Sequence, residues 1–246
     1  MKTVYLILIV YIVLLVSCKK DTIETPITPI VKCLVISTIS KTEGETYILV
    51  YEYDTKGRRV KRSLNSLTTN YYVDEYIYES SKIIHNRKFK DKVDYQWIYL
   101  LNSDGTLASS STNKNGKIET EISKYNKEGY LIECIYSSGG STTNEYIDGN
   151  LSNKIFRASD GNISKTTYQY YTDKLDTHDT DYFITPGLLG KGNKNLVKSY
   201  TITSNGNVYT VNESYLFDDK GNTSQITHDS KDVNYQGVDK FTYECR

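Results

Sequence analysis

The sequence predicts an all-β protein, a single large antiparallel meander that forms a strongly curved sheet or a partly closed barrel. Twenty-four of its 246 residues are tyrosine, and Thr, Ile and Val are also frequent, as is typical of strands. Short turn signals in which Gly follows Asp, Asn or Glu recur along the chain and supply the positive φ angles of tight hairpins. Helical periodicity is absent from nearly all of the chain beyond its first residues.

The turn signals separate runs that are rich in Tyr, Ile, Val and Thr. They stand at 54–57, 104–105, 115–116, 128–129, 148–149, 160–161, 205–206 and 219–221. One of these runs has large apolar side chains at every second position. They are Val93, Tyr95, Trp97, Tyr99 and Leu101. A stripe with a period of two packs against a core, so we expect Trp97 to be a core residue and not a ligand-stacking one.

The N-terminus has the features of an export signal. Lys2 precedes an apolar run, Val4 to Val16, which is too short to span a bilayer comfortably. The run ends in Leu-Val-Ser-Cys18, which resembles the bacterial lipobox, in which the peptidase cleaves just before a lipidated cysteine. The sequence therefore predicts a signal peptide at 1–17 and lipidation of Cys18. The alternative is an ordinary secretory signal with a chance cysteine.

Two regions follow the signal peptide. Residues 18–31 comprise the lipidated cysteine and an extended tether that contains Pro26 and Pro29, and 32–246 form the single β domain. Lys19-Lys20-Asp21 resembles the charged export signal of Bacteroidetes-type surface lipoproteins. This resemblance favours an outer-membrane lipoprotein displayed at the cell surface, with a periplasm-facing orientation as the alternative.

Three cysteines remain after Cys18, namely Cys33, Cys134 and Cys245, so at most one intramolecular bridge can form. A bridge between Cys33 and Cys245 requires the first and last strands to meet, which a closed sheet permits. Separate buried thiols are nevertheless the expectation.

Several turn-strand units resemble tyrosine-aspartate repeats. They are Tyr51 to Arg58, Tyr125 to Leu131 and Tyr215 to Asn222. Together with the lipobox and the stretch from Tyr182 to Leu196, these units resemble a Bacteroidetes lipoprotein family of unknown function. The resemblance implies a porin-like fold with a large curved antiparallel sheet, and an exported location. It transfers no catalytic residue.

Catalytic and nucleic-acid-binding functions find little support. Thirty basic and thirty acidic side chains give a net charge of zero, which does not favour nucleic acid as a partner. The chain lacks the HExxH, GxSxG and CxxC motifs. His178 and His228 each precede an Asp, but neighbouring residues on a strand point to opposite faces, so both are expected to be loop-surface residues. We predict no enzyme activity and no cofactor.

An acidic stretch is the one candidate for a metal site. Asp173, Asp176, Asp179 and Asp181 would converge on a hard cation such as calcium if they share a loop. The alternative is a solvated acidic loop.

Two sets of residues are candidates for ligand binding. Tyr168, Tyr170 and Tyr171 could stack against sugar rings, and Arg58 and Arg59, within a basic cluster, could bind an anionic glycan or lipid headgroups. The alternatives are cross-strand pairs for the tyrosines and solvated strand faces for the basic residues.

These features indicate a non-enzymatic binding lipoprotein that is attached to the membrane through the lipid on Cys18. A glycan or another envelope component is the expected ligand. The alternative is a structural or adhesive surface protein that presents loops and has no small-molecule ligand. An integral outer-membrane barrel is disfavoured because polar residues lie opposite the aromatic stripes, and enzyme activity has low weight.

Replacing Cys18 tests the anchor. Cys18→Ser removes the sulfur that accepts the lipid, so the protein should leave the membrane fraction and accumulate as unprocessed precursor. Fractionation with immunoblotting measures both effects, and Cys134→Ser is the control. A Cys18→Ser protein that is still cleaved and membrane-bound would refute lipidation.

Overall fold

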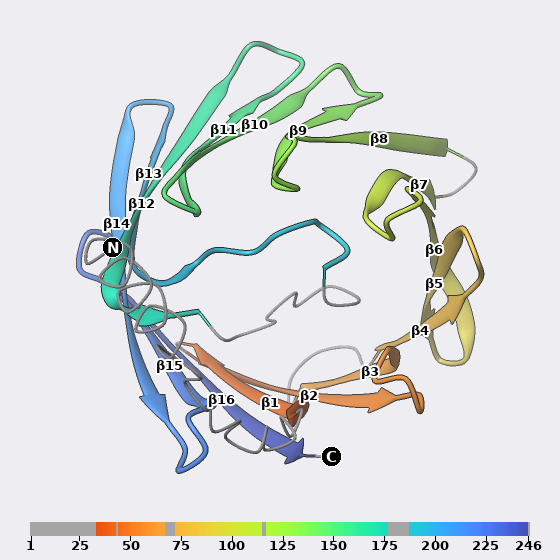
Figure 1. Ribbon diagram of the computed structural model, residues 1–246, viewed down its shortest axis with the longest axis horizontal. Coiled ribbons are helices and arrows are strands. Elements are labelled where there is room, and N and C mark those ends of the chain that lie inside the picture. Colours follow the sequence, from red (N-terminus) through yellow and green to blue (C-terminus); the bar gives the residue numbers. More distant parts are fainter. Residues whose placement is uncertain (1–32, 43, 67–71, 115–116, 177–186, 246) are drawn as a thin grey trace, which may run out of the picture. The chain divides into compact units, whose positions relative to one another are not determined.

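The computed structural model describes residues 33–42, 44–66, 72–114, 117–176 and 187–245. Sixteen strands form a closed antiparallel barrel in which each strand pairs with its neighbours in sequence and the last pairs with the first (Figure 1). The predicted all-β meander is confirmed, and its curvature extends to complete closure. Within the described ranges, no helix is long and apolar enough to cross a membrane.

The strand bounds follow the meander in order. They are β1 (Cys33–Thr42), β2 (Glu45–Tyr53), β3 (Arg59–Ser66), β4 (Tyr72–Tyr78), β5 (Lys82–Phe89), β6 (Lys92–Leu101), β7 (Leu107–Lys114), β8 (Lys117–Tyr125), β9 (Leu131–Tyr136), β10 (Ser141–Ile147), β11 (Asn150–Arg157), β12 (Ile163–Leu175), β13 (Asn195–Ser204), β14 (Asn207–Phe217), β15 (Thr223–Ser230) and β16 (Tyr235–Cys245).

The tyrosine-aspartate-like units form one kind of turn. In the turn between β2 and β3, Asp54 Oδ1 accepts hydrogen bonds from the backbone N–H groups of Lys56 and Arg58, both at 2.9 Å. Gly57 adopts a φ of 75°, which an L side chain rarely tolerates. Asn126 and Asp218 make the same pair of bonds at the β8–β9 and β14–β15 turns. The side chain before each turn therefore sets its geometry locally.

Pairing between β1 and β16 closes the ring. Cys33 lies opposite Cys245 in this register, and the two form a disulfide. The expectation of separate buried thiols is wrong for this pair, because barrel closure brings the ends of the domain together. Cys134 on β9 is the free, buried thiol of the described region.

Alternation along the strands gives the barrel an inner and an outer wall. The inner wall is formed by side chains that lie opposite one another on neighbouring strands, as do Tyr51, Arg62, Asp74 and Arg87 on β2 to β5. Residues of the other parity face outward, and three pairs of them form ion pairs across adjacent strands. These are Lys61–Glu52 at 2.8 Å, Lys88–Glu75 at 2.6 Å and Lys124–Glu133 at 2.7 Å. Charged pairs thus interrupt the exposed aliphatic side chains of the outer wall.

A segment before β13, residues 187–194, is here named the strap because it runs across the interior of the ring (Figure 1). Its backbone is hydrogen-bonded to three other parts of the barrel: Leu188 O accepts from Leu107 N at 2.8 Å, and the N–H groups of Lys191 and Lys194 donate to turn carbonyls at 2.9 Å. Leu188 packs in a cluster with Tyr76, Ile83 and Leu107. The strap is therefore fixed at several points.

Gly190 permits this crossing. Its φ is 83°, and an added Cβ would collide with the carbonyl oxygen of Gly129 and with the ring of Tyr125. Only glycine fits where the strap passes this close to the β8–β9 turn.

The aromatic stripe on β6 is less regular than its sequence suggests. Val93 is 53% exposed, because Asp94 on β6 has no partner on β5 and the register shift there moves Val93 to the outer wall. Trp97 is on the inner wall but only half-buried. Trp97 thus packs on the inner wall against His85, as expected of a core residue, although it is less enclosed than the sequence predicts.

Removing the disulfide tests its contribution to barrel closure. The double variant Cys33→Ser/Cys245→Ser should lower the free energy of unfolding by about 2–4 kcal/mol, because the unfolded chain is no longer cross-linked. Urea denaturation monitored by circular dichroism measures this change. Dithiothreitol should bring the wild type down to the value of the variant and leave the variant unchanged. Equal stabilities without reductant would contradict the prediction.

Candidate functional site

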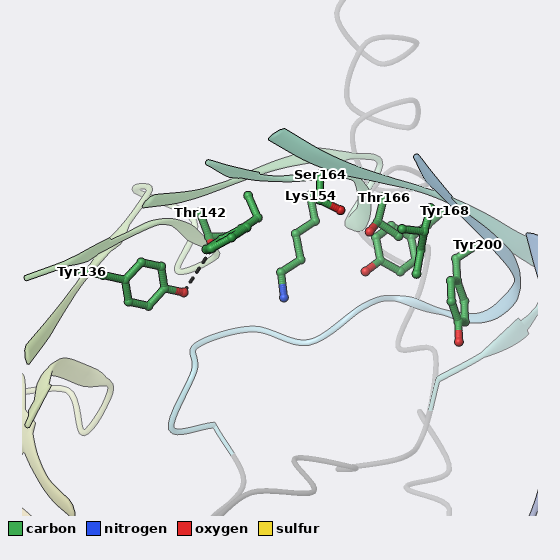
Figure 2. Close-up of a pocket in the computed structure, with 9 residues that line it drawn as sticks. Tyr136, Thr142, Lys154, Ser164, Thr166, Tyr168 and Tyr200 are labelled. Atoms are coloured by element: carbon green, nitrogen blue, oxygen red, sulfur yellow. Dashed lines mark hydrogen bonds between the residues drawn. The ribbon is translucent and has the colours of Figure 1, made fainter. Parts of the chain in front are cut away.

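A cavity of about 390 Å³ lies against the inner wall between β9 and β13. Its lining consists of Tyr136, Thr142, Lys154, Phe156, Ser164, Thr166, Tyr168, Tyr200 and Ile202. Figure 2 shows the side chains that it labels projecting from the wall toward the interior. The cavity therefore combines aromatic rings, hydroxyl groups and one ammonium group.

Strand register brings these residues together. Thr142 on β10 lies opposite Phe156 on β11, and Phe156 lies opposite Ser164 on β12. Tyr168 on β12 lies opposite Tyr200 on β13. Each strand contributes alternate residues to one surface, so the site is a product of pairing between strands that are distant in sequence.

The phenol groups of the cavity remain neutral. Burial raises the pKa of Tyr200 to about 12, and the nearby Glu213 carboxylate adds to the rise. Burial also raises the pKa of Tyr168 and Tyr136, and the Tyr136 hydroxyl is 3.1 Å from Thr142 Oγ1 (Figure 2). These hydroxyls can therefore both donate and accept hydrogen bonds at neutral pH.

The rings of the cavity are loosely arranged. The ring centroids of Tyr168 and Tyr200 are 6.1 Å apart at an angle of 41°, and those of Tyr136 and Phe156 are 6.2 Å apart in an edge arrangement. Neither pair is closely stacked face to face, and the Tyr170 ring stacks on Tyr168 at 6.5 Å, so the rings are spaced more widely than in a close stack.

The three tyrosines predicted as one stacking platform have separate roles. Tyr168 lines the cavity. The Tyr170 hydroxyl donates to Leu151 O at 2.8 Å and lies 3.1 Å from Asn193 Oδ1 of the strap. The Tyr171 hydroxyl donates to Glu213 O at 3.0 Å. The structure therefore brings Tyr168 and Tyr170 together, with ring centroids 6.5 Å apart, and places the Tyr171 ring against Tyr215 instead.

Arg58 and Arg59 lie at the β2–β3 turn and do not line the cavity. Arg58 pairs with Asp54 at 2.7 Å and covers the Tyr78 ring at 4.3 Å. The Arg59 guanidinium covers the Tyr51 ring at 4.4 Å. In this arrangement both side chains brace the turn and the neighbouring wall.

The acidic stretch divides between a strand end and the segment that follows it. Asp173 belongs to β12, and the backbone N–H of Asp176 donates to Lys194 O at 2.9 Å. Asp179 and Asp181 lie outside the described residues. Within the described part of the chain, no group of three His, Cys, Asp or Glu residues could hold a metal ion.

His178 lies outside the described residues. His228 lies on β15 and on the inner wall, so the prediction that it is a loop-surface residue is wrong. The Nδ1 atom of His228 is 3.2 Å from Glu213 Oε1, and its Nε2 atom is 3.3 Å from Asp239 Oδ2. Burial lowers the pKa of His228, but the hydrogen bonds and charges of Asp239 and Glu213 outweigh burial and raise the pKa to about 9. The imidazolium joins β14, β15 and β16.

A second buried network, of hydrogen-bonded charged side chains, lies on β3 to β6. The sequence did not predict it. Asp74 is fully buried and accepts hydrogen bonds from Arg62 Nε and Arg87 Nε, both at 2.9 Å, while His85 Nε2 lies 2.8 Å away. Burial raises the pKa of Asp74, but the hydrogen bonds from His85 and Arg87 and the charge of Arg62 outweigh it and hold the pKa well below its usual range.

Beside this network, aromatic side chains of β4, β5 and β6 stack on one another. His85 stacks between Tyr76 and Trp97 at 4.6 and 4.4 Å, and Tyr95 lies over Trp97 at 5.5 Å. His85 and Tyr95 both stack on Trp97, so its ring contributes to the packing of the wall.

Comparison with known proteins shows the fold. The barrel is similar to a porin-like protein from Bacteroides uniformis, with a TM-score of 0.63 and 14% identity over 85% of this chain and 98% of the other. A porin-like protein from Bacteroides vulgatus gives a TM-score of 0.56 and 13% identity over the same shares. No family model and no curated protein matches the sequence. The porin-like fold implied by the sequence resemblance is thus confirmed.

The raised pKa of His228 predicts a pH-dependent contribution to stability. The folded pKa lies above the unfolded value of about 6.5, so the stabilisation is complete below that value and is lost as the pH rises through about 9. Between pH 6.5 and 9.5, the wild type should lose up to about 3 kcal/mol more stability than His228→Gln. Urea denaturation at several pH values measures this difference, and parallel profiles would exclude the effect.

Proposed function

We propose that this chain is a non-enzymatic lipoprotein of a bacterial outer membrane, attached through a lipid on Cys18 and displayed at the cell surface. Its barrel binds a glycan in the cavity between β9 and β13. The cavity is the observation that carries the proposal. Its aromatic rings suit the apolar faces of sugars, and its hydroxyls suit their polar edges.

The contrast between the two aromatic groups of the inner wall supports this location. Around Trp97, neighbouring rings stack at 4.4 and 5.5 Å and cover one another. In the cavity, ring centroids are more than 6 Å apart, and the hydroxyls of Thr142, Ser164 and Thr166 lie among them. Binding sites mix aromatic surface with polar groups in this way.

The outer wall supports attachment by a lipid instead of by burial in the bilayer. A barrel wall in contact with lipid presents a continuous apolar band, and charged side chains on that band are destabilising. The pairs Lys61–Glu52, Lys88–Glu75 and Lys124–Glu133 place charges on the outward faces of six strands. Such a surface is suited to water.

Substitution of the two cavity tyrosines tests glycan binding. The purified protein is screened against an array of bacterial, plant and animal glycans, and ligands are titrated by calorimetry. Tyr168→Ala and Tyr200→Ala should each weaken binding about tenfold, because each removes one aromatic wall of the cavity.

Tyr95→Ala is the matched control, because Tyr95 lies on the opposite part of the inner wall, against Trp97. It should bind as the wild type does. If no glycan binds, or if all three variants bind equally, the proposed site is wrong and a structural or adhesive role without a small ligand gains support.

A further inference from the structure

The proposed glycan site contains one charged side chain, Lys154. It lies on β11 between Asn144 of β10 and Thr166 of β12, and is exposed to the lumen. Figure 2 shows its ammonium group extending away from the wall, between Thr142 and Thr166. The cavity thus presents a positive charge with hydroxyl groups on both sides.

Lys154 differs from three other cations of the inner wall. Arg62 and Arg87 pair with Asp74, and His228 pairs with Glu213 and Asp239. Among the described residues, no carboxylate forms an ion pair with Lys154. Its charge is therefore available to a ligand.

The carboxylates closest to the cavity have other partners. Glu213, which lies near Tyr168 and Tyr200, pairs with His228. Glu121 lies on β8, three strands from β11, or about 14 Å at the usual strand spacing. It accepts a hydrogen bond from Ser110 Oγ at 3.5 Å and interacts with the Cys134 thiol. Among the described residues, neither Glu121 nor Glu213 forms an ion pair with Lys154.

We infer that the glycan bound in this cavity is acidic and that Lys154 binds the carboxylate of a uronic acid residue. This inference rests on the proposed function and specifies its ligand class. An ammonium–carboxylate hydrogen bond in a partly enclosed site is stronger than a neutral one. The hydroxyl of Thr166, which lies directly opposite Lys154 on β12, is placed to donate to the same carboxylate, while Tyr168 and Tyr200 contact the sugar ring.

Matched saccharides isolate the carboxylate. Oligogalacturonides and glucuronate-containing trisaccharides are each titrated beside their carboxyl-reduced forms, in which the carboxylate becomes a primary alcohol. The wild type should bind the acidic forms at least tenfold more tightly. Raising the salt concentration should narrow this difference, because salt screens a partly exposed ion pair.

Variants of Lys154 then assign the preference to this residue. Lys154→Met should reduce affinity for acidic forms to that for the reduced forms, and Lys154→Arg should retain most of the preference. Lys165→Met is the matched control, because Lys165 lies on β12 with the opposite, outward parity. It makes the same change in net charge and should leave binding unchanged.

The outcomes separate the two proposals. If reduced and acidic forms bind equally and Tyr200→Ala weakens both, the glycan site stands and the acidic preference is refuted. If Lys165→Met and Lys154→Met lower affinity equally, the preference comes from overall charge and the role of Lys154 is refuted. If no saccharide binds, both proposals fail.

Discussion

Pairing between β1 and β16 is the constraint on which the rest of the structure depends. A closed ring has no free sheet edge, and it requires inward residues on each strand to lie opposite inward residues on the next. The cavity, the Asp74 network and the His228 cluster are consequences of this rule, because each assembles side chains of one parity from several strands. An open sheet with the same turns would leave its terminal strands unpaired.

The features of the fold that depend on neighbouring residues were predictable from sequence. Asp54 and Gly57 determine their turn through hydrogen bonds and a positive φ within five residues, so the meander was predicted correctly. The disulfide between Cys33 and Cys245 joins residues separated by 212 positions and depends on closure, which no local pattern encodes. The position of Val93 was not predicted for a related reason, since the unpaired Asp94 on β6 shifts its parity although the sequence alternates there without interruption.

The candidate site was less predictable than the fold. Tyr168 was identified because it belongs to a tyrosine-rich run, but its partners Tyr200 and Lys154 come from other strands and adjoin it only through register. The sequence predicts a surface position for His228. Its neighbour Asp229 points to the opposite face of the strand and cannot pair with it. The carboxylates that hold it, Glu213 and Asp239, are on adjacent strands. Pairing across strands, and not sequence proximity, decides which charges meet.

The position of the disulfide also has a mechanical consequence. The chain enters the barrel at Cys33, so a pull on the N-terminal segment is applied to the first residue of β1. Without a cross-link, such a pull would peel β1 from β16 by breaking their hydrogen bonds one after another. The covalent bond to Cys245 instead passes the load directly to the last strand at the point of entry. A barrel cross-linked in this way would resist the peeling that would otherwise separate β1 from β16.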